Sequence, residues 1–458
     1  MKKLRRILSV LMAVVCLLAA ANIPAAAKTC TCDTLPVVHI PGIGSPLYMN
    51  GTGQGITLGT AGGGMNAALG GLWDLLWAPN TEEALTKLKK LVKDLVGKLQ
   101  ADTAGNTVEP LTPAKNWADP AQDHTKNRNY YFHYDWRLDP MQAARSLNTF
   151  IKQVQEVTGH KKIILAAHSE GGIVGNAYLA LYGHGSLDHY IADVSAAGGV
   201  TLIEELFTGN LMINRTSFKA LLQRMLGWLV GGSLSLTADV GFYDGLIKDA
   251  KELLAEGGER LTAEVFTPYF AQWPALWAFI TNDSKYTAAK KYMLDSKKHA
   301  ALIEKIDAYH NQAGRKAAAL LKAAKADGVK VSIIAKYGWP AYPFFPGWEV
   351  STDTIIDTAR ESFGARVAKN NQNLGKDYKQ TNSDGHNHIS PNKQIDASTC
   401  AFPESTWFFK SLAHGNQPSG EFLAFLYNSK EQPTVHSDKR FPQFMKWDGF
   451  FRVITADS

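Results

Sequence analysis

The order of apolar and polar positions predicts strands that alternate with amphipathic helices through the first half of the chain. Runs rich in β-branched and aromatic residues predict strands, and apolar positions repeated every three or four residues predict helices. The predicted strands cover residues 35–40, 130–136, 162–167 and 190–197, and the predicted helices cover residues 81–99, 141–157 and 170–181. This alternation indicates an α/β fold, a mostly parallel central sheet with helices on both faces.

The alternation stops after the fourth predicted strand. From about residue 202 to residue 324 the pattern is mainly helical, and residues 329–335 and 406–412 then resume the strand pattern. We therefore expect a large helical cap, or lid, inserted between two strands of one sheet. The segment 51–77 is both glycine-rich and apolar, and we expect it to form a mobile loop that lines an apolar site together with the cap.

The N-terminal residues have the features of a secretory signal peptide. A positively charged start, MKKLRR, precedes the apolar run ILSVLMAVVCLLAA and the small residues of IPAAAK, so we expect cleavage after Ala27. The apolar run is shorter than the roughly 18 residues of a membrane span. Cys16 raises a lipoprotein signal as an alternative, which the bulky Val14 and Val15 disfavour. Residues 28–458 are then a single exported domain.

The composition is that of a globular protein, and the net charge bears on one class of partner, nucleic acid. Hydrophobic residues make up 45% of the chain and charged residues 20%, which is typical of a globular protein with a sizeable core. The formal net charge is +6, and four of these charges belong to the predicted signal peptide, which leaves about +2 for residues 28–458. So small a charge gives no reason to expect a nucleic-acid partner.

Three cysteines follow the predicted cleavage site: Cys30, Cys32 and Cys400. An exported chain permits disulfides. A bridge between Cys30 and Cys32 would close a very small loop, so Cys400 paired with one of the two is favoured. We expect no metal site here, because no histidine or further cysteine lies at short spacing from Cys30.

Ser169 lies between a predicted strand and a predicted helix, in the stretch IILAAHSEGG. The nucleophile elbow G-x-S-x-G needs small residues two before and two after the serine, because strand and helix nearly touch there. Here Ala167 replaces the first glycine and Gly171 supplies the second. The alternative is an ordinary serine N-cap. The strand before Ser169 and the helix after it favour the nucleophile.

A nucleophilic serine needs a histidine base, and the later histidines of the chain supply the candidates. His414 directly follows the predicted strand 406–412, where this fold type places its base. His386 and His388 remain rivals, and His436, in a polar tail, is the weakest candidate.

The acid that orients the histidine is expected after the predicted strand 329–335. Asp384, in the turn Ser383-Asp384-Gly385, is favoured because it lies thirty residues before His414. Asp353 and Asp357 lie nearer to that strand and are the alternatives.

The oxyanion of an acyl-transfer intermediate needs backbone N–H donors. One is expected from Glu170, directly after the serine, and the other from the loop Pro41–Ser45 after the first strand. The mechanism does not use the Glu170 carboxylate, and we expect that group to point to solvent.

Three blocks of the sequence are similar to a known family: VVHIPGIGSPL, YDWRLDP and AAHSEGGIVGNAYL. With them, the chain resembles the lecithin:cholesterol acyltransferase family of α/β-hydrolases, in a bacterial secreted branch. The middle block is the most specific, since a generic hydrolase does not require it. The later segments SDG and LAHG follow in the family's order. Ala167 and Glu170 depart from the family pattern. Because of these departures, the resemblance defines the class of reaction better than it defines the substrate.

The resemblance implies an α/β-hydrolase fold and a lid-covered esterase that acts on acyl lipids. It also implies a role for seven residues: Ser169, Asp384 and His414 as the catalytic triad, Gly44 and Glu170 as oxyanion donors, and Asp135 and Arg137 as a buried supporting pair.

These observations predict a secreted serine hydrolase or O-acyltransferase for acyl esters of lipids, with no metal or organic cofactor. A non-catalytic secreted protein that binds a lipid or glycan on a hydrolase scaffold is the alternative. A third hypothesis keeps the chemistry but replaces the lipid with a peptide or a soluble ester. The basic helix 81–99 could contact a lipid surface, although packing on the core is favoured.

Overall fold

The computed structural model describes residues 30–57, 80–210, 212, 259–340, 347 and 349–456. The predicted signal peptide, most of the glycine-rich segment 51–77 and the middle of the predicted cap lie outside these ranges. Within them, no helix has the length and apolar character that crossing a membrane requires.

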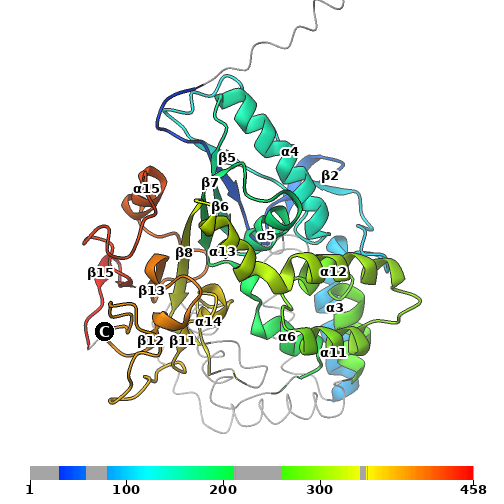
Figure 1. The fold of residues 1–458 in the computed structure, drawn as a ribbon. Coiled ribbons are helices and arrows are strands. Elements are labelled where there is room, and N and C mark those ends of the chain that lie inside the picture. Colours follow the sequence, from blue (N-terminus) through cyan, green and yellow to red (C-terminus); the bar gives the residue numbers. More distant parts are fainter. Residues whose placement is uncertain are drawn as a thin grey trace, which may run out of the picture.

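An eight-stranded sheet runs through the centre of the protein, in the order β15-β14-β13-β8-β7-β6-β1-β5 (Figure 1). All neighbouring pairs are parallel except β14 and β15, which are antiparallel. The protein therefore has the predicted α/β fold. Its strands are β1 (Val37–Ile40), β5 (Asn129–Tyr131), β6 (Ile163–His168), β7 (Leu187–Asp193), β8 (Lys330–Tyr337), β13 (Thr406–Lys410), β14 (Phe444–Trp447) and β15 (Phe451–Val453).

Helices cover both faces of this sheet (Figure 1). Helices α4 and α5 pack on each other, and α12 and α13 pack against α5 on the same side. Helix α15 lies on the other side. The helices are α3 (Thr81–Val96), α4 (Pro140–Thr158), α5 (Gly171–Tyr182), α6 (Thr201–Phe207), α9 (Thr267–Tyr269), α10 (Pro274–Trp277), α11 (Asp283–Met293), α12 (Ala300–Gln312), α13 (Ala317–Ala326), α14 (Thr358–Glu361) and α15 (Gly420–Asn428).

Alternate residues of the central strands enter two separate cores, because successive side chains of a strand point to opposite faces. Leu165 of β6 packs in the core beneath α4 and α5, whereas its neighbour Ile164 packs with Phe422 and Leu426 of α15. Burial on both faces explains why β6 reads as a continuous apolar run in the sequence.

Three small antiparallel sheets lie outside the central one. The first follows β1 in the chain and the other two lie between β8 and β13. They consist of β2 (Leu47–Met49), β3 (Thr52–Ile56) and β4 (Leu111–Pro113), then β9 (Trp339–Pro340) with β10 (Ser351–Thr352), and β11 (Arg366–Val367) with β12 (Ile395–Asp396).

Two predicted strands are shorter in the structure. The predicted strand 130–136 is β5 only as far as Tyr131, because Asp135 then accepts the backbone N–H of Arg137 in a turn at 3.1 Å. The predicted strand 190–197 ends at Asp193, since Val194 has a φ of 44° and Ser195 caps a short 3-10 helix.

The described part of the predicted cap, residues 202–324, is helical and contains no strand among the residues that the structure places. Its last helix, α13, packs on α5 and on β8. That helix therefore belongs to the layer that covers the sheet. The expectation that the remainder forms a lid over Ser169 stays a prediction.

The predicted disulfide is wrong. Cys400 is buried in the core with Ala335 and Phe408, and its thiol lies 3.6 Å from Thr406 Oγ1. Cys30 and Cys32 instead lie beside each other, with 3.2 Å between their sulfurs. The fold holds Cys400 against a different part of the sheet, so it cannot reach either sulfur.

Candidate active site

Ser169 lies on a tight turn between the carboxyl end of β6 and the start of α5. Its φ of 56° is rare for a residue with a side chain and is typical of a strained functional turn. A Cβ added to Gly171 would lie 2.3 Å from the carbonyl oxygen of Ile40 in β1. Glycine is therefore required two residues after Ser169, as the elbow pattern predicts, while the buried Ala167 fits two residues before it.

His414 lies next to Ser169, with 2.9 Å between its Nε2 and the Ser169 Oγ. It follows β13, as the sequence predicts for the base. The other ring nitrogen, Nδ1, makes a hydrogen bond with Asp353 Oδ2. The backbone N–H of His414 donates to the carbonyl oxygen of Asp353 at 2.8 Å, which fixes the two residues relative to each other.

The acid beside His414 is therefore Asp353, and the favoured assignment of Asp384 is corrected. Asp384 lies on an exposed turn, where its Oδ2 is 2.8 Å from Nε2 of His388. The rival base His388 thus faces Asp384 and not Ser169. Asp357 accepts the backbone N–H of Thr201 at 2.8 Å, away from His414.

Asp353 is fully buried, and its carboxylate is held from both sides. Its Oδ1 accepts the backbone N–H groups of Ile355 and Ile356, each at 2.8 Å. Burial by itself would raise the pKa of Asp353, but the hydrogen bond and charge of His414 outweigh it and lower that pKa. An ionised Asp353 can hold the imidazole in one orientation and stabilise its protonated form.

A second buried acid, Glu361, lies against Asp353, and the sequence analysis did not identify it. Burial, followed by the charge of Asp353, raises the pKa of Glu361 well above its ordinary value. The surroundings of Glu361 therefore favour its protonated form. Its Oε2 accepts the backbone N–H of Lys336 at 2.7 Å. The interaction with Glu361 also lowers the pKa of Asp353.

Lys336 positions the loop that carries His414. The side chain is fully buried in β8, and its Nζ donates to the carbonyl oxygens of His414 and Asn416, each at 2.7 Å. A buried ammonium with carbonyl partners orders the chain after β13 and keeps His414 in place.

A second imidazole and carboxylate pair lies beside the serine. His168 Nδ1 is 2.8 Å from Asp193 Oδ2, and the rings of His168 and His414 are 5.3 Å apart. Burial alone would raise the pKa of Asp193, but the charges of Lys336, His168 and His414 lower it to about 2. Each of the two rings therefore has a carboxylate with a lowered pKa beside it: Asp353 for His414 and Asp193 for His168.

The loop after β1 lies against Ser169, as the oxyanion hypothesis requires. A Cβ added to Gly42 would come within 2.8 Å of the Ser169 Oγ, and Gly44 has a φ of 100°. Two side chains of the YDWRLDP block hold this loop. The Tyr134 hydroxyl donates to the Pro41 carbonyl oxygen at 2.8 Å, and Trp136 Nε1 donates to the Ser45 carbonyl oxygen at 2.9 Å.

The two backbone N–H groups expected as oxyanion donors lie directly after the serine and in the loop after β1. Those of Gly44 and Glu170 donate to no residue in the described part of the chain. Because backbone donors without partners are rare inside proteins, this pair suits the binding of an oxyanion.

The carboxyl group of Glu170 does not point to solvent, so that prediction is wrong. Glu170 is only 1% exposed, with its Oε2 3.4 Å from the Tyr134 hydroxyl. Burial, with a smaller contribution from the charge of Asp135, raises the pKa of Glu170 well above its ordinary value. The hydroxyl proton of Tyr134 already goes to Pro41, so a neutral Glu170 can donate in return to the Tyr134 oxygen.

Asp135 and Arg137 form the predicted ion pair. Arg137 is fully buried, and its Nη2 and Nε lie 2.6 Å from Oδ2 and 2.9 Å from Oδ1 of Asp135. Nη2 also donates to Thr107 Oγ1 at 3.2 Å, and the Arg137 carbonyl accepts the N–H of Ala275. The pair joins the loop after β5 to α10 and contacts neither Ser169 nor His414 among the interactions of the described residues.

A serine hydroxyl, an imidazole and a buried carboxylate thus form one hydrogen-bonded chain. In such a chain the imidazole can take the hydroxyl proton as the oxygen attacks a carbonyl carbon, and the carboxylate stabilises the resulting cation.

Comparison with protein-family models finds no match, and comparison with curated proteins finds no relative. A chain in the crystal structure of the Tle4-Tli4 complex is 15% identical, with a TM-score of 0.27 over 66% of this chain and 75% of that chain. A likeness of this size carries no conclusion about function.

Proposed function

We propose that the protein is a serine hydrolase of the α/β-hydrolase type, with Ser169 as the nucleophile. The observation that carries the proposal is the hydrogen-bonded chain from Ser169 Oγ to His414 Nε2, at 2.9 Å, and from His414 Nδ1 to Asp353. The position of Ser169 on a strained strand-to-helix turn supports it, because that turn presents a nucleophile to a substrate.

The proposed reaction is acyl transfer through a covalent intermediate. Ser169 Oγ attacks the ester carbonyl while His414 takes the hydroxyl proton, and the N–H groups of Gly44 and Glu170 bind the oxyanion. The C–O bond of the ester then breaks, and His414 returns its proton to the departing alkoxide. Water or an alcohol, deprotonated by His414, then attacks the acyl-enzyme and releases Ser169.

We propose acyl esters of lipids as the substrate class. The resemblance of the three sequence blocks to lipid acyltransferases supports this class. We also retain the proposal that residues 1–27 direct export, so the reaction would take place outside the cytoplasm.

Hydrolysis of a series of acyl esters tests the proposal. Purified protein is incubated with short-chain esters, long-chain esters and phospholipid vesicles, beside Ser169→Ala. The exposed Ser437→Ala serves as a matched control. We expect turnover of long-chain esters by the wild type and the control, and a loss of at least about a thousandfold in Ser169→Ala.

Each other outcome rejects a definite part of the proposal. Equal rates with Ser169→Ala would reject the nucleophile, and binding to vesicles without turnover would favour a lipid-binding protein. Turnover of short soluble esters alone would reject the lipid substrate. Addition of an acceptor alcohol, followed by a search for a new ester, separates acyl transfer from hydrolysis.

A further inference from the structure

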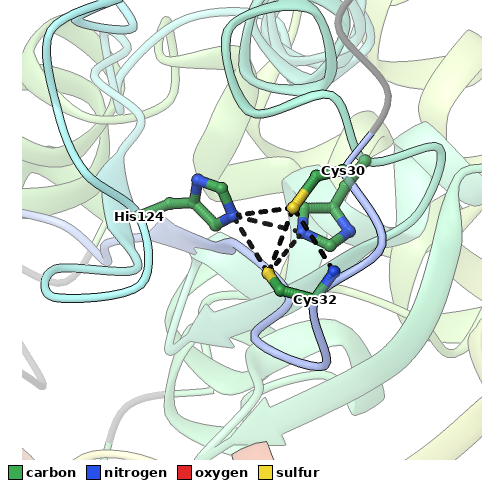
Figure 2. Close-up of side chains that lie close together, drawn as sticks. Cys30, Cys32 and His124 are labelled. Atoms are coloured by element: carbon green, nitrogen blue, oxygen red, sulfur yellow. Dashed lines mark hydrogen bonds between the residues drawn. The ribbon is translucent and has the colours of Figure 1, made fainter.

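Four side chains from three separate parts of the chain lie close together before the amino end of β6. Ser169 follows the carboxyl end of the same strand. The four side chains are those of Cys30, Cys32, His124 and His160, whose sulfur and ring nitrogen atoms all lie within 4.8 Å of one another. Figure 2 shows the two sulfurs and the His124 ring nitrogen turned toward a common centre. All four residues are at least partly buried.

The distances between these atoms are those of metal ligands. Cys32 Sγ lies 3.4 Å from Nε2 of both His124 and His160, Cys30 Sγ lies 3.6 Å from His124 Nε2, and the two Nε2 atoms are 3.2 Å apart. Tetrahedral zinc, with its usual bond lengths, separates sulfur from nitrogen by about 3.6 Å and nitrogen from nitrogen by about 3.4 Å.

The separation of the two sulfurs excludes a disulfide bond between Cys30 and Cys32 in this structure. Their separation of 3.2 Å is far longer than a disulfide bond, which is about 2.05 Å. It needs to open by only about half an ångström to match two thiolates on one tetrahedral zinc ion. The cysteines are thus placed for shared coordination, although only Thr31 separates them.

We propose that Cys30, Cys32, His124 and His160 bind a zinc ion. Two thiolates and two imidazoles are a ligand set that favours zinc, and tetrahedral geometry distinguishes it from the square-planar sites of copper or nickel. Four protein ligands leave no position for water or substrate, so the site is structural. This inference is independent of the proposed hydrolase activity.

The position of the cluster explains what the metal would hold together. Cys32, His124 and His160 precede the amino ends of β1, β5 and β6, which are neighbours in the sheet. Ser169 follows the carboxyl end of β6, so the cluster lies at the opposite edge. The zinc ion would fasten the first described residues to two loops that lie 92 and 128 residues further along the chain. Cross-links over such long loops restrict the unfolded chain strongly.

The segment that carries the two cysteines also has other contacts: the Pro36 carbonyl oxygen accepts the N–H of Ile164 at 2.9 Å, and the Leu35 carbonyl oxygen accepts from Arg128 Nε at 3.0 Å. The backbone N–H of Cys30 donates to the Gly159 carbonyl oxygen at 3.1 Å, next to His160. Asp33 forms an exposed ion pair with Lys430, which contributes little to stability. The metal would therefore add a cross-link to the contacts that already join this segment to the sheet.

Metal analysis of the full-length protein tests the inference. Zinc per chain is measured by mass spectrometry for the wild type, Cys32→Ser and His160→Asn. Cys400→Ala and His184→Asn are the matched controls, since neither residue belongs to the cluster. We expect about one zinc ion per chain in the wild type and in both controls, and loss of the ion in the two ligand variants. A chelator should lower the melting temperature of the wild type.

Two results would overturn the inference. One is a wild-type protein, purified with zinc present, that retains no metal. The other is a Cys30–Cys32 disulfide in the purified protein. Because substitution of the buried His160 risks misfolding, cobalt substitution of the wild type provides a second measurement. Tetrahedral cobalt with thiolate ligands gives intense visible and near-ultraviolet bands, and a spectrum without them would also overturn it.

Discussion

At the scale of single residues, buried carboxyl groups set the electrostatics of the site. Asp353 is ionised because His414 and two backbone N–H groups stabilise its charge. Burial raises the pKa of Glu361 and of Glu170 well above the ordinary value, and the hydrogen bonds from Lys336 and Tyr134 do not offset it. Carboxyl groups of the same chemistry are therefore shifted in opposite directions within one site.

The first prediction concerns the choice between Asp353 and Asp384. Asp353→Asn removes the charge that stabilises protonated His414, so kcat should fall by about a thousandfold to ten-thousandfold. Asp384→Asn, on the exposed turn beside His388, should stay within about twofold of the wild type. Ester hydrolysis by the two variants decides between them, and the reverse ranking would restore Asp384 as the acid.

The second prediction concerns Glu170. The pKa of its carboxyl group is raised in the folded protein, so its contribution to stability is present below the unfolded pKa of about 4.5 and is lost as pH rises through the folded value. Glu170→Gln removes this loss and keeps both the backbone N–H and a side-chain donor. Its free energy of unfolding relative to the wild type should therefore be more favourable at pH 8 than at pH 5.

Chemical denaturation at the two pH values measures this difference. A Glu170→Gln variant whose relative stability is lower at pH 8 than at pH 5 would mean that the wild-type carboxyl group is charged in the fold.

At the scale of elements, the turn from β6 to α5 depends on close approach of three backbones. Strand β1 passes so near to Gly171 that its Ile40 carbonyl occupies the place of a Cβ. The contact links Ser169 to the strand whose following loop carries Gly44, the proposed second oxyanion donor. Packing at this turn should therefore affect both stability and activity.

The third prediction tests that contact. In Gly171→Ala the new Cβ would lie 2.3 Å from a backbone oxygen, so β1 must shift away from β6. Overpacking of this kind costs about 1–3 kcal/mol, and we also expect a large loss of activity. Gly185→Ala, where a Cβ meets nothing within 4 Å, is the control. Equal melting temperatures and activities for the two variants would contradict the proposed packing.

The sequence predicted elements best where burial is continuous and a turn signal follows. Strand β6 and helices α4 and α5 lie close to their predicted bounds, because apolar periodicity and the glycines after Ser169 mark them clearly. Asp353 was only an alternative, since it lies in an irregular excursion between β8 and β13 where no periodicity orders the candidates. The buried acid Glu361 has no signal in the sequence, because only the fold buries it.

At the scale of the whole molecule, the two edges of the sheet carry different groups. The carboxyl ends of β6, β8 and β13 lead to Ser169, Asp353 and His414, whereas the amino ends of β5, β1 and β6 adjoin the cysteine and histidine cluster. From the order of residues along the chain, the sequence analysis favoured Ser169 and His414 and kept Asp353 as an alternative. It could not predict the cysteine and histidine cluster, because only the strand order β5-β1-β6 brings His124 and His160 to the cysteines.

The fourth prediction concerns acid sensitivity of the whole fold. Burial, followed by the charge of Lys330, lowers the pKa of His189 to about 3. Because the unfolded chain binds this proton near pH 6.5, the stability from neutral His189 is present above that pH and decreases as pH falls toward 3. This group alone contributes a slope of up to about 1.4 kcal/mol per pH unit.

Unfolding measured between pH 7 and pH 4 tests this assignment. His189→Asn, which retains a polar group beside Ser332, should show a shallower decrease in stability than the wild type. The partly exposed His184→Asn should retain the wild-type slope. An unchanged slope in His189→Asn would mean that His189 does not govern this acid sensitivity.

The identity of the nucleophile is the central claim, and covalent labelling tests it most directly. Purified protein is treated with a long-chain alkyl fluorophosphonate, which reacts with activated serines, and its peptides are analysed by mass spectrometry. The account predicts one phosphonyl group per chain, on the peptide that contains Ser169, and none in Ser169→Ala. Modification of another residue, or ester hydrolysis that continues without modification of Ser169, would contradict it.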